Sequence, residues 1–437
     1  MYDAALDPSP VGEQRVRIAV IGSGIAGLSA ARALSARHRV TIFERANRAG
    51  GHVNTVHVPT ATGPVALDTG FLVFNRRNYP GLDALFRDLE IDTRPSDMSF
   101  AVTLGQRGGA LEWAGGNGLA GLFAQPRRVG DPLHWRMVAG ILRFNRHARA
   151  ALRRGPVAGT VGEFLDAGRH HSLVAQRYLL PMTGAIWSCP PQRMREVPAA
   201  TLFTFLDNHG LLQLRGRPRW RTVEGGSSRY VDRLLETSPV ELHLGSPVER
   251  VWRRGGMPVV AWRDRQERFD ACVFACHADE ALGLLADASR REQSILGGFR
   301  FSDNFAFLHR DASLMPASRA AWASWNVRLE PGQGSRTAGV AVTYWLNRLQ
   351  RLAAPEDYFV TLNPARRPRN ALTAMRYTHP VIDATAVACQ KRLPEIQGRG
   401  GLFYAGAWTG YGFHEDGLLS GLAVARRLGA EPGSVAA

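Results

Sequence analysis

The sequence predicts an α/β fold in which a Rossmann-like domain with a parallel sheet is interrupted by an inserted domain of mixed α+β structure. Three observations support this prediction. An apolar run at residues 15–21 leads directly into a glycine-rich turn, a second apolar run ends in Glu44, and a buried-type run at residues 401–406 precedes a helical pattern near the end of the chain. With 437 residues and 45% hydrophobic content, the chain is long and apolar enough for two domains.

The glycine-rich turn predicts a site for a dinucleotide. Gly22 permits a tight turn, Gly24 lets the backbone approach a pyrophosphate, and Gly27 lets the following helix close onto the strand. The amino end of that helix then faces the phosphates with unpaired N–H groups. Glu44 follows Gly24 by 20 residues, where a carboxylate can accept both ribose hydroxyls. Together with the pair Gly50 and Gly51, this order predicts FAD.

The remaining elements are predicted in chain order. Residues 94–219 read as helical and irregular, and Glu224-Gly225-Gly226 repeats the cofactor-type turn before a helix at 230–235. Strands are expected at 240–244, 247–252, 258–262 and 269–275. Alternating aromatic runs at 304–309, 321–327, 339–345 and 358–362 then suggest an antiparallel sheet that faces a cavity, and 401–406 and 417–428 form a last strand and helix. We therefore assign 15–90, 221–295 and 398–430 to the cofactor domain and 91–220 and 296–397 to the substrate domain.

Charge and composition restrict the class of protein. The net charge of +16 is carried almost entirely by arginine and favours anionic partners, but no nucleic-acid-binding motif accompanies it. Residues 1–14 show no secretory pattern, and no run of about 18 apolar residues suggests a spanning helix. The cysteines Cys189, Cys272, Cys276 and Cys389 form no metal-ligand pattern and suit a reducing compartment. We expect a cytoplasmic protein, soluble or peripheral to a membrane, without a metal site.

Three further motifs carry a resemblance to a known family. They are Asp68-Thr-Gly70-Phe-Leu-Val-Phe-Asn75, Asn208-His-Gly210 and Gly410-Tyr-Gly-Phe-His-Glu-Asp-Gly417. With the interleaved cofactor segments, they resemble the FAD-binding superfamily of flavin amine oxidases, phytoene desaturases, protoporphyrinogen oxidases and fatty-acid isomerases. Within it they are similar to a bacterial branch known as predicted NAD/FAD-binding amine oxidoreductases, whose members often accompany cyclopropane-fatty-acid-synthase-like methyltransferases. This resemblance implies a glutathione-reductase-type FAD domain, and the companion enzymes point to acyl chains.

The resemblance also implies which residues contact FAD. Val248 matches a backbone contact to adenine, Gly406 a contact beside the ribityl chain, and Gly417 and Leu418 the approach of the last helix to the flavin pyrimidine ring. A helix N-terminus there would stabilise the anion of reduced flavin. The full expected set is Gly22, Gly24, Ile25, Ala26, Gly27, Glu44, Arg45, Gly50, Gly51, His52, Gly70, Phe71, Val248, Gly406, Ala407, Gly417 and Leu418. Two positions depart from the family pattern: Ala407-Trp408 replaces an acidic residue, and His52 stands where many relatives have arginine.

Candidate catalytic residues are few. Amine oxidases of the superfamily place a lysine near the flavin, but the single lysine here, Lys391, reads as a solvated helical residue, which weakens amine oxidation. His414 can act as a base or proton shuttle, or it can brace the last helix through Glu415 and Asp416. His209 can face the cavity or be a buried structural histidine. The aromatic residues are expected first in the core and second on a substrate wall; they are Trp187, Trp322, Trp325, Tyr344 and Trp345.

Residues 134–154 read as a basic amphipathic helix. Met137, Ile141, Phe144, Ala148 and Ala151 recur at helical spacing among several arginines. This pattern predicts one of two arrangements. Either the apolar stripe packs onto the core of the substrate domain, or the helix docks on anionic lipid.

The favoured function is an FAD-dependent oxidoreductase that takes a hydride from a CH–CH unit of a hydrophobic substrate, such as an acyl chain of a membrane lipid. Dioxygen, a quinone or another acceptor would then reoxidise the reduced flavin. Amine oxidation and flavin-dependent double-bond isomerisation are the alternatives. A non-catalytic lipid- or prenyl-binding protein, similar to Rab escort proteins, is disfavoured because the cofactor motif is intact.

Overall fold

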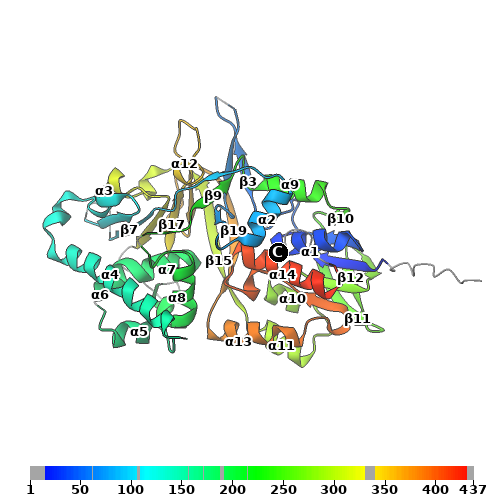
Figure 1. Cartoon of the computed structure of the whole chain (residues 1–437). Coiled ribbons are helices and arrows are strands. Elements are labelled where there is room, and N and C mark those ends of the chain that lie inside the picture. Colours follow the sequence, from blue (N-terminus) through cyan, green and yellow to red (C-terminus); the bar gives the residue numbers. More distant parts are fainter. Residues whose placement is uncertain are drawn as a thin grey trace, which may run out of the picture.

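The computed structural model describes residues 15–61, 63–105, 109–155, 157–170, 172–187, 191–213, 215–329 and 340–430. Figure 1 shows a parallel sheet with its helices at one end of the molecule, a large second sheet in the middle and a helical unit at the other end. The expectations for residues 1–14, for Cys189 and for the start of the strand at 339 lie outside the described residues. No helix in the described ranges combines the length and apolarity that crossing a bilayer requires.

The parallel sheet has the order β10-β2-β1-β14-β20. Its apolar strands are paired in register, with Ile18 opposite both Val40 and Ala271. Such continuously apolar strands are expected where both faces of a parallel sheet are covered. The strands are β1 (Arg17–Ile21), β2 (Arg39–Phe43), β10 (Val240–His243), β14 (Ala271–Phe274) and β20 (Leu402–Tyr404). The predicted βαβ opening, the strands near 240 and 270 and the final strand are confirmed.

Two layers cover this sheet. Four helices share one core with Ile18, Val20 and Ile42; they are α1 (Ile25–Ser35), α2 (Pro80–Asp88), α9 (Ser228–Glu236) and α14 (His414–Arg427). The α1 and α14 backbones approach so closely that a Cβ on Gly421 would overlap the carbonyl oxygen of Ala26. The other face packs on β11 (Val248–Arg254), β12 (Met257–Trp262), α10 (Ala278–Leu284), α11 (Arg290–Leu296) and α13 (Ala384–Arg392). Strand β13 (Arg265–Arg268) pairs with β12.

The second sheet has seven strands in the order β19-β15-β18-β17-β16-β7-β8. All of its pairings are antiparallel except β16 with β7, which is parallel. The strands are β7 (Phe100–Leu104), β8 (Leu111–Gly115), β15 (Arg300–His309), β16 (Trp325–Leu329), β17 (Ala341–Trp345), β18 (Phe359–Leu362) and β19 (Ala371–Val381). Our description of 94–219 as helical and irregular is therefore wrong for β7 and β8, and the strand expected at 321–327 begins only at Trp325. Strand β7 pairs with β16, which lies more than 200 residues away in the chain, and β8 pairs with β7.

The helical unit comprises α3 (Gly118–Leu122), α4 (Pro132–Arg153), α5 (Val161–Ala167), α6 (Ser172–Val174), α7 (Leu180–Trp187) and α8 (Ala199–Asn208). Helix α4 begins where the Asp131 carboxylate accepts a hydrogen bond from the Leu133 amide. It buries Met137, Phe144 and Ala148, as the apolar stripe predicted. Smaller elements join the two halves: β3 (Thr55–Val58), β4 (Val65–Asp68), β5 (Phe74–Asn75), β6 (Thr93–Pro95), β9 (Trp220–Val223) and α12 (Leu346–Leu349).

Candidate active site

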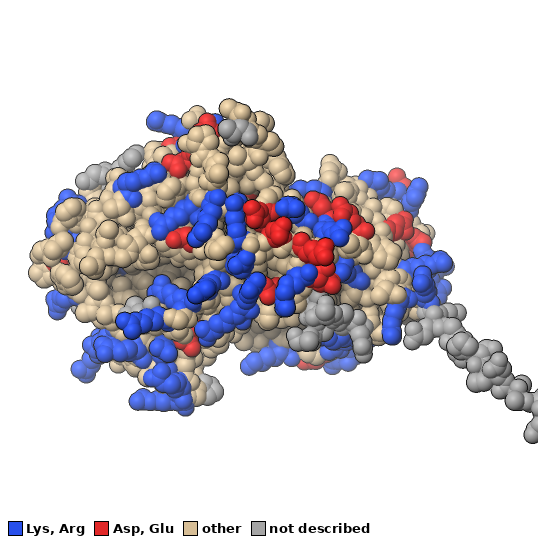
Figure 2. Space-filling model, turned by 45° about the horizontal axis from the view of Figure 1, so that its top comes forward, with Lys and Arg blue, Asp and Glu red and all other residues tan. Residues whose placement is uncertain are grey.

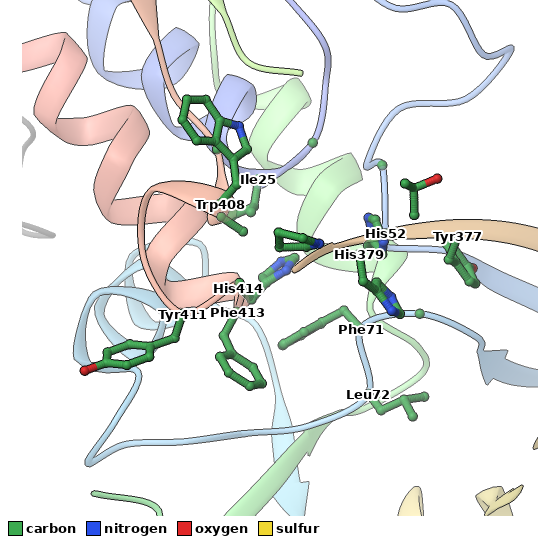
Figure 3. A pocket seen from close by; sticks show the side chains of 18 of the residues that line it. Ile25, His52, Phe71, Leu72, Tyr377, His379, Trp408, Tyr411, Phe413 and His414 are labelled. Carbon is green, nitrogen blue, oxygen red and sulfur yellow. The ribbon is translucent and has the colours of Figure 1, made fainter. Parts of the chain in front are cut away.

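One cavity of about 1350 Å³ runs from the end of the parallel sheet to the inner face of the seven-stranded sheet. It is lined by most of the residues that the sequence singled out, and also by side chains from β19 and α8. Of the predicted site residues, all but Gly27, Gly417 and Leu418 lie on its wall. Figure 3 shows Phe71, His52, His379 and His414 around one part of this space.

The glycine-rich turn shapes the end of the cavity at α1. Gly22 has φ +103°, and a Cβ there would lie 2.8 Å from the Ala275 carbonyl oxygen, so only glycine fits without strain. A Cβ on Gly27 would overlap the Gly22 carbonyl oxygen, which explains why Gly27 packs helix against strand and does not line the cavity. A Cβ on Gly24, in contrast, would meet no atom within 4 Å. Gly24 therefore faces open space at the amino end of α1.

This helix end is built to receive an anion. Gly24 is the N-cap of α1, no side chain caps the free amides, and no acidic residue occurs in the first turn. Open N–H groups at a helix N-terminus carry partial positive charge and bind phosphate. Gly51 lies against this turn, since its Cβ would be 3.0 Å from the Gly24 Cα. The residues present thus fit the pyrophosphate of FAD.

Glu44 stands at the end of β2, beside this turn. Its carboxylate accepts hydrogen bonds from the Ser23 amide (3.0 Å), the Ser23 hydroxyl (2.6 Å) and the Ala46 amide (2.8 Å). These bonds fix the carboxylate on the cavity wall, where it can accept ribose hydroxyls. Val248 also lines this end, and Arg45 pairs with Glu280 at 2.8 Å. The two glycines of the second cofactor-type turn, Gly225 and Gly226, do not line the cavity, and their contact with a cofactor stays a prediction.

The loop after β2 is held by Arg48, whose guanidinium donates to the carbonyl oxygens of Val53 (2.8 Å) and Gly51 (2.9 Å). Beyond it, the His52 carbonyl accepts from the Phe71 amide at 2.9 Å, and a Cβ on Gly70 would overlap that same carbonyl oxygen. Gly50, Gly51, His52, Gly70 and Phe71 thereby form one continuous stretch of cavity wall.

The last helix differs from its prediction. It begins at His414, three residues before the expected start, because the Asp416 carboxylate caps the Phe413 amide at 2.9 Å. Gly406 and Ala407 line the cavity, whereas Gly417 packs against Ile25 and Leu418 is fully buried in the core. Gly417 and Leu418 do not line this cavity, whereas Tyr411 to His414 do, and the approach of Gly417 and Leu418 to a flavin stays a prediction.

His414 lines the cavity and is held rigidly. Its Nε2 lies 2.6 Å from the Tyr230 hydroxyl, and its ring stacks on Phe71 with centroids 4.0 Å apart. The expected alternative, bracing through Glu415 and Asp416, is wrong in detail: Glu415 accepts from the amides of Gly81 and Leu82 at the start of α2. Burial lowers the pKa of His414 to about 3, so the imidazole is neutral at neutral pH.

His209 combines the two alternatives that the sequence left open. It ends α8, lines the cavity and stacks on Phe205 with centroids 3.9 Å apart. Its Nδ1 lies 2.9 Å from the Phe205 carbonyl oxygen, which can only accept, so Nδ1 carries the ring proton and Nε2 keeps a lone pair. Burial lowers the pKa of His209 to about 4.

Sequence reasoning missed two further histidines on the wall, His277 and His379, because no local motif marks them. The Asn304 amide group donates to Nδ1 of His379 at 3.1 Å and to the Ser302 carbonyl oxygen at 3.0 Å. The neutral His379 ring therefore carries its proton on Nε2. His52 stacks near Tyr377 and His379, and its buried Nε2 has no hydrogen-bond partner among the described residues. Burial lowers the pKa of His52, His277 and His379.

The far wall is apolar. Phe100, Trp325 and Tyr344 form a row across β7, β16 and β17, with the last two rings 4.9 Å apart. Trp187 also lines the cavity, as do Met182 and Leu362 on either side. Two of the expected aromatics do not: Trp322 and Trp345 pack together in a separate cluster with Phe359.

Two further findings concern residues outside this apolar wall. Lys391 is exposed on α13 and does not line the cavity. Cys272 is a buried core residue, whereas Cys276 lies on the cavity wall. Burial raises the pKa of both thiols.

Known proteins resemble this chain in sequence and in fold. A model of the family described as flavin containing amine oxidoreductase matches residues 25–297. The carotenoid phi-ring synthase of Streptomyces griseus is 36% identical over 317 residues, which are 65% of this chain and 57% of that protein, so the match spans less than two thirds of the relative.

Solved structures share the fold. A CLA-producing fatty acid isomerase from P. acnes has a TM-score of 0.67 at 16% identity, covering 95% of this chain and 99% of that one. Cyclohexylamine oxidase from Brevibacterium oxydans has a TM-score of 0.64 at 15% identity, covering 95% and 100%. Identities this low establish a common fold and nothing finer.

Proposed function

Because the chain belongs to the flavin-containing amine oxidoreductase family, we propose that this oxidoreductase takes a hydride from a CH–CH unit of a hydrophobic substrate such as a fatty acyl chain. FAD is its cofactor. What we propose is the class of substrate and the CH–CH unit from which the hydride is removed. We further propose that residues 15–90, 221–295 and 398–430 bind FAD and that 91–220 and 296–397 bind the substrate.

The observation that carries this proposal is that no carboxylate on the described cavity wall is left without a protein partner, and the cations on that wall are arginines, which repel an ammonium group. The sole lysine is outside the cavity, and the wall carboxylates Glu44, Asp97 and Glu280 are already engaged by protein donors. The five lining histidines are neutral because burial lowers their pKa values. An ammonium substrate would lose its hydration without gaining a free counter-charge, whereas an apolar chain fits such a wall.

The chain's own residues then have distinct roles. The uncapped start of α1, Gly24 and Gly51 bind the pyrophosphate, and Glu44 binds the ribose. The row of Phe100, Trp325 and Tyr344 holds the substrate chain and excludes water.

In the proposed desaturation, a hydride and a proton leave adjacent carbons and a C=C bond forms between them. Bound FAD supplies the two-electron acceptor, which dioxygen or a quinone regenerates. His209 is the first candidate to take the proton, because its Nε2 lone pair is fixed by the Nδ1 contact to Phe205. His414 is the second, and its ring is held by Tyr230.

Names of relatives support a hydrophobic substrate without identifying it. One curated relative is named for a carotenoid, and one structural neighbour for a fatty acid. An acyl-lipid substrate would come from a membrane, so contact with an anionic membrane is part of this proposal.

Anaerobic mixing tests it. The purified holoprotein is mixed without oxygen with a saturated phospholipid, a free fatty acid, a carotenoid or a primary amine, and flavin absorbance and products are followed. We expect lasting bleaching and a desaturated product with an acyl chain or a carotenoid. Bleaching by the amine alone, with imine or aldehyde product, would establish amine oxidation instead. A rearranged double bond without lasting bleaching would establish isomerisation, and a protein that takes up no FAD would be a binding protein.

A further inference from the structure

An exposed apolar patch lies at the end of the molecule remote from the parallel sheet. Of the large apolar side chains that are more than a third exposed in the described ranges, five fall between residues 119 and 142. Leu119 is 75% exposed, Val129 55%, Trp135 49% and Leu142 37%. Isolated exposed apolar residues are ordinary, but a group of them marks an interaction surface.

Contacts between these residues join them into one surface. The Phe123 amide donates to the Leu119 carbonyl oxygen, the Phe123 ring lies 4.9 Å from the Trp135 ring, and the Trp135 indole donates to the Val129 carbonyl oxygen at 2.8 Å. Leu142 follows Trp135 by seven residues, two helical turns along α4. We call Leu119, Phe123, Val129, Trp135 and Leu142 the apolar patch.

The patch lies on the solvent side of α4. The opposite side of the helix buries Met137, Phe144 and Ala148, so α4 uses one apolar face for the core and carries a second on the surface. This second face differs from the stripe that the sequence offered for docking, which the structure buries. The core beneath it, with Val102 and Met137, extends to Phe100 on the cavity wall.

The charges around the patch are of one sign. Residues 113–162 contain eight arginines and a single acidic residue, Asp131, which pairs with Arg128 and caps α4. Arg136 and Arg143 directly follow Trp135 and Leu142 and are exposed, and neither pairs with a carboxylate in the described part of the chain. Figure 2 shows acidic side chains concentrated on the other half of the molecule in this view, with arginines prominent at this end.

We propose that the apolar patch and its flanking arginines dock this protein on the surface of an anionic lipid membrane. Trp135 and Leu142 insert at the boundary between headgroups and acyl chains, and Arg136 and Arg143 contact lipid phosphates. The tryptophan suits this depth because its indole is apolar with one polar edge. The docking deepens the proposed function, which requires a route from the membrane for an acyl substrate.

Vesicle sedimentation tests the docking with the full-length holoprotein. We expect the protein to sediment with phosphatidylglycerol vesicles, to bind phosphatidylcholine vesicles weakly, and to dissociate at high salt. The double variant Trp135→Ser with Leu142→Ser should bind roughly tenfold or more weakly. Arg136→Gln with Arg143→Gln should bind roughly thirtyfold more weakly and show a smaller salt dependence.

The matched control is Leu244→Ser with Leu372→Ser, which removes two leucines of similar exposure, 37% and 41%, elsewhere on the surface. Flavin content and circular dichroism establish that each variant is folded. The proposal would be overturned if the patch variants bound vesicles as tightly as the control variant does. It would also be overturned if the patch variants alone changed from dimer to monomer, because the patch would then be an interface between copies of this chain. Sedimentation needs no turnover, so it can fail or succeed independently of the anaerobic substrate test.

Discussion

Replacing Gly24 by alanine should separate cofactor binding from folding. The Gly24 backbone, at φ −69° and ψ 177°, suits any L-residue, and the added methyl group would meet no protein atom within 4 Å. Loss of glycine at the N-cap costs a few tenths to 1 kcal/mol, and the reduced freedom of the unfolded chain offsets about 0.4–1 kcal/mol, so stability should change by less than about 1 kcal/mol. The same methyl group stands where we place the pyrophosphate. Forced contact of this kind costs about 1–3 kcal/mol, which weakens FAD binding roughly five- to hundredfold.

Two measurements on the apoprotein check this expectation: urea unfolding for stability, and quenching of FAD fluorescence for the dissociation constant. Gly27→Ala is the matched control. Its methyl group would overlap the Gly22 carbonyl oxygen and lie 3.1 Å from the Ala275 Cβ, so α1 must move away from β1 and stability should fall by about 3 kcal/mol. If Gly24→Ala folded normally and bound FAD as tightly as the parent, the pyrophosphate would not lie at this turn.

Three further predictions address the same site and its surroundings. Glu44→Gln should weaken FAD binding about five- to thirtyfold by calorimetry, because a neutral amide accepts the ribose hydroxyls less strongly than a carboxylate; unchanged affinity would remove Glu44 from the ribose site. Burial lowers the pKa of fully buried His309 to about 4, so below pH 6.5 the unfolded state binds the extra proton, and roughly 3 kcal/mol of stability should be lost as the pH falls to 4. The pKa of Asp68 is raised to about 6, so its protonation adds stability as the pH falls and opposes the loss from His309. Urea unfolding of His309→Asn and of the parent over this pH range therefore isolates the contribution of the histidine. Equal pH dependence of the free energy of unfolding in the two proteins would contradict the assignment to His309. Lys391→Met should leave the rate of flavin reduction unchanged in stopped-flow mixing, and a large loss would restore the case for a catalytic lysine.

The cofactor end of the molecule was predictable because its signals are local. The turn at Gly22, the helix after Gly24 and the acid at Glu44 all fall within 23 residues of sequence, and their spacing is set by backbone geometry. The start of α14 also had a local signal that we did not use: Asp416 stands three residues after Phe413, the position from which a carboxylate caps a helix.

The substrate end was not predictable in the same way because its elements depend on distant partners. Strand β7 pairs with β16 in parallel, and the row of Phe100, Trp325 and Tyr344 exists only once both have found β17. His379 reaches the cavity because β19 pairs with β15, and the Asn304 contact that fixes its tautomer crosses 75 residues. No sequence window contains both members of such a contact.

The surface and the cavity differ in the charges that they offer to a substrate. Arginines on the outside attract anionic surfaces at a distance, whereas within the described cavity every carboxylate is engaged and the imidazoles are neutral. An anionic group drawn by that surface would have to give up its hydration on entering the apolar part of the cavity at Phe100, Trp325 and Tyr344, which costs several kcal/mol without a compensating partner. An acyl lipid avoids this cost because its anionic headgroup can stay at the arginine-rich surface while only its apolar chain enters. The surface and the cavity therefore favour opposite ends of one amphipathic molecule.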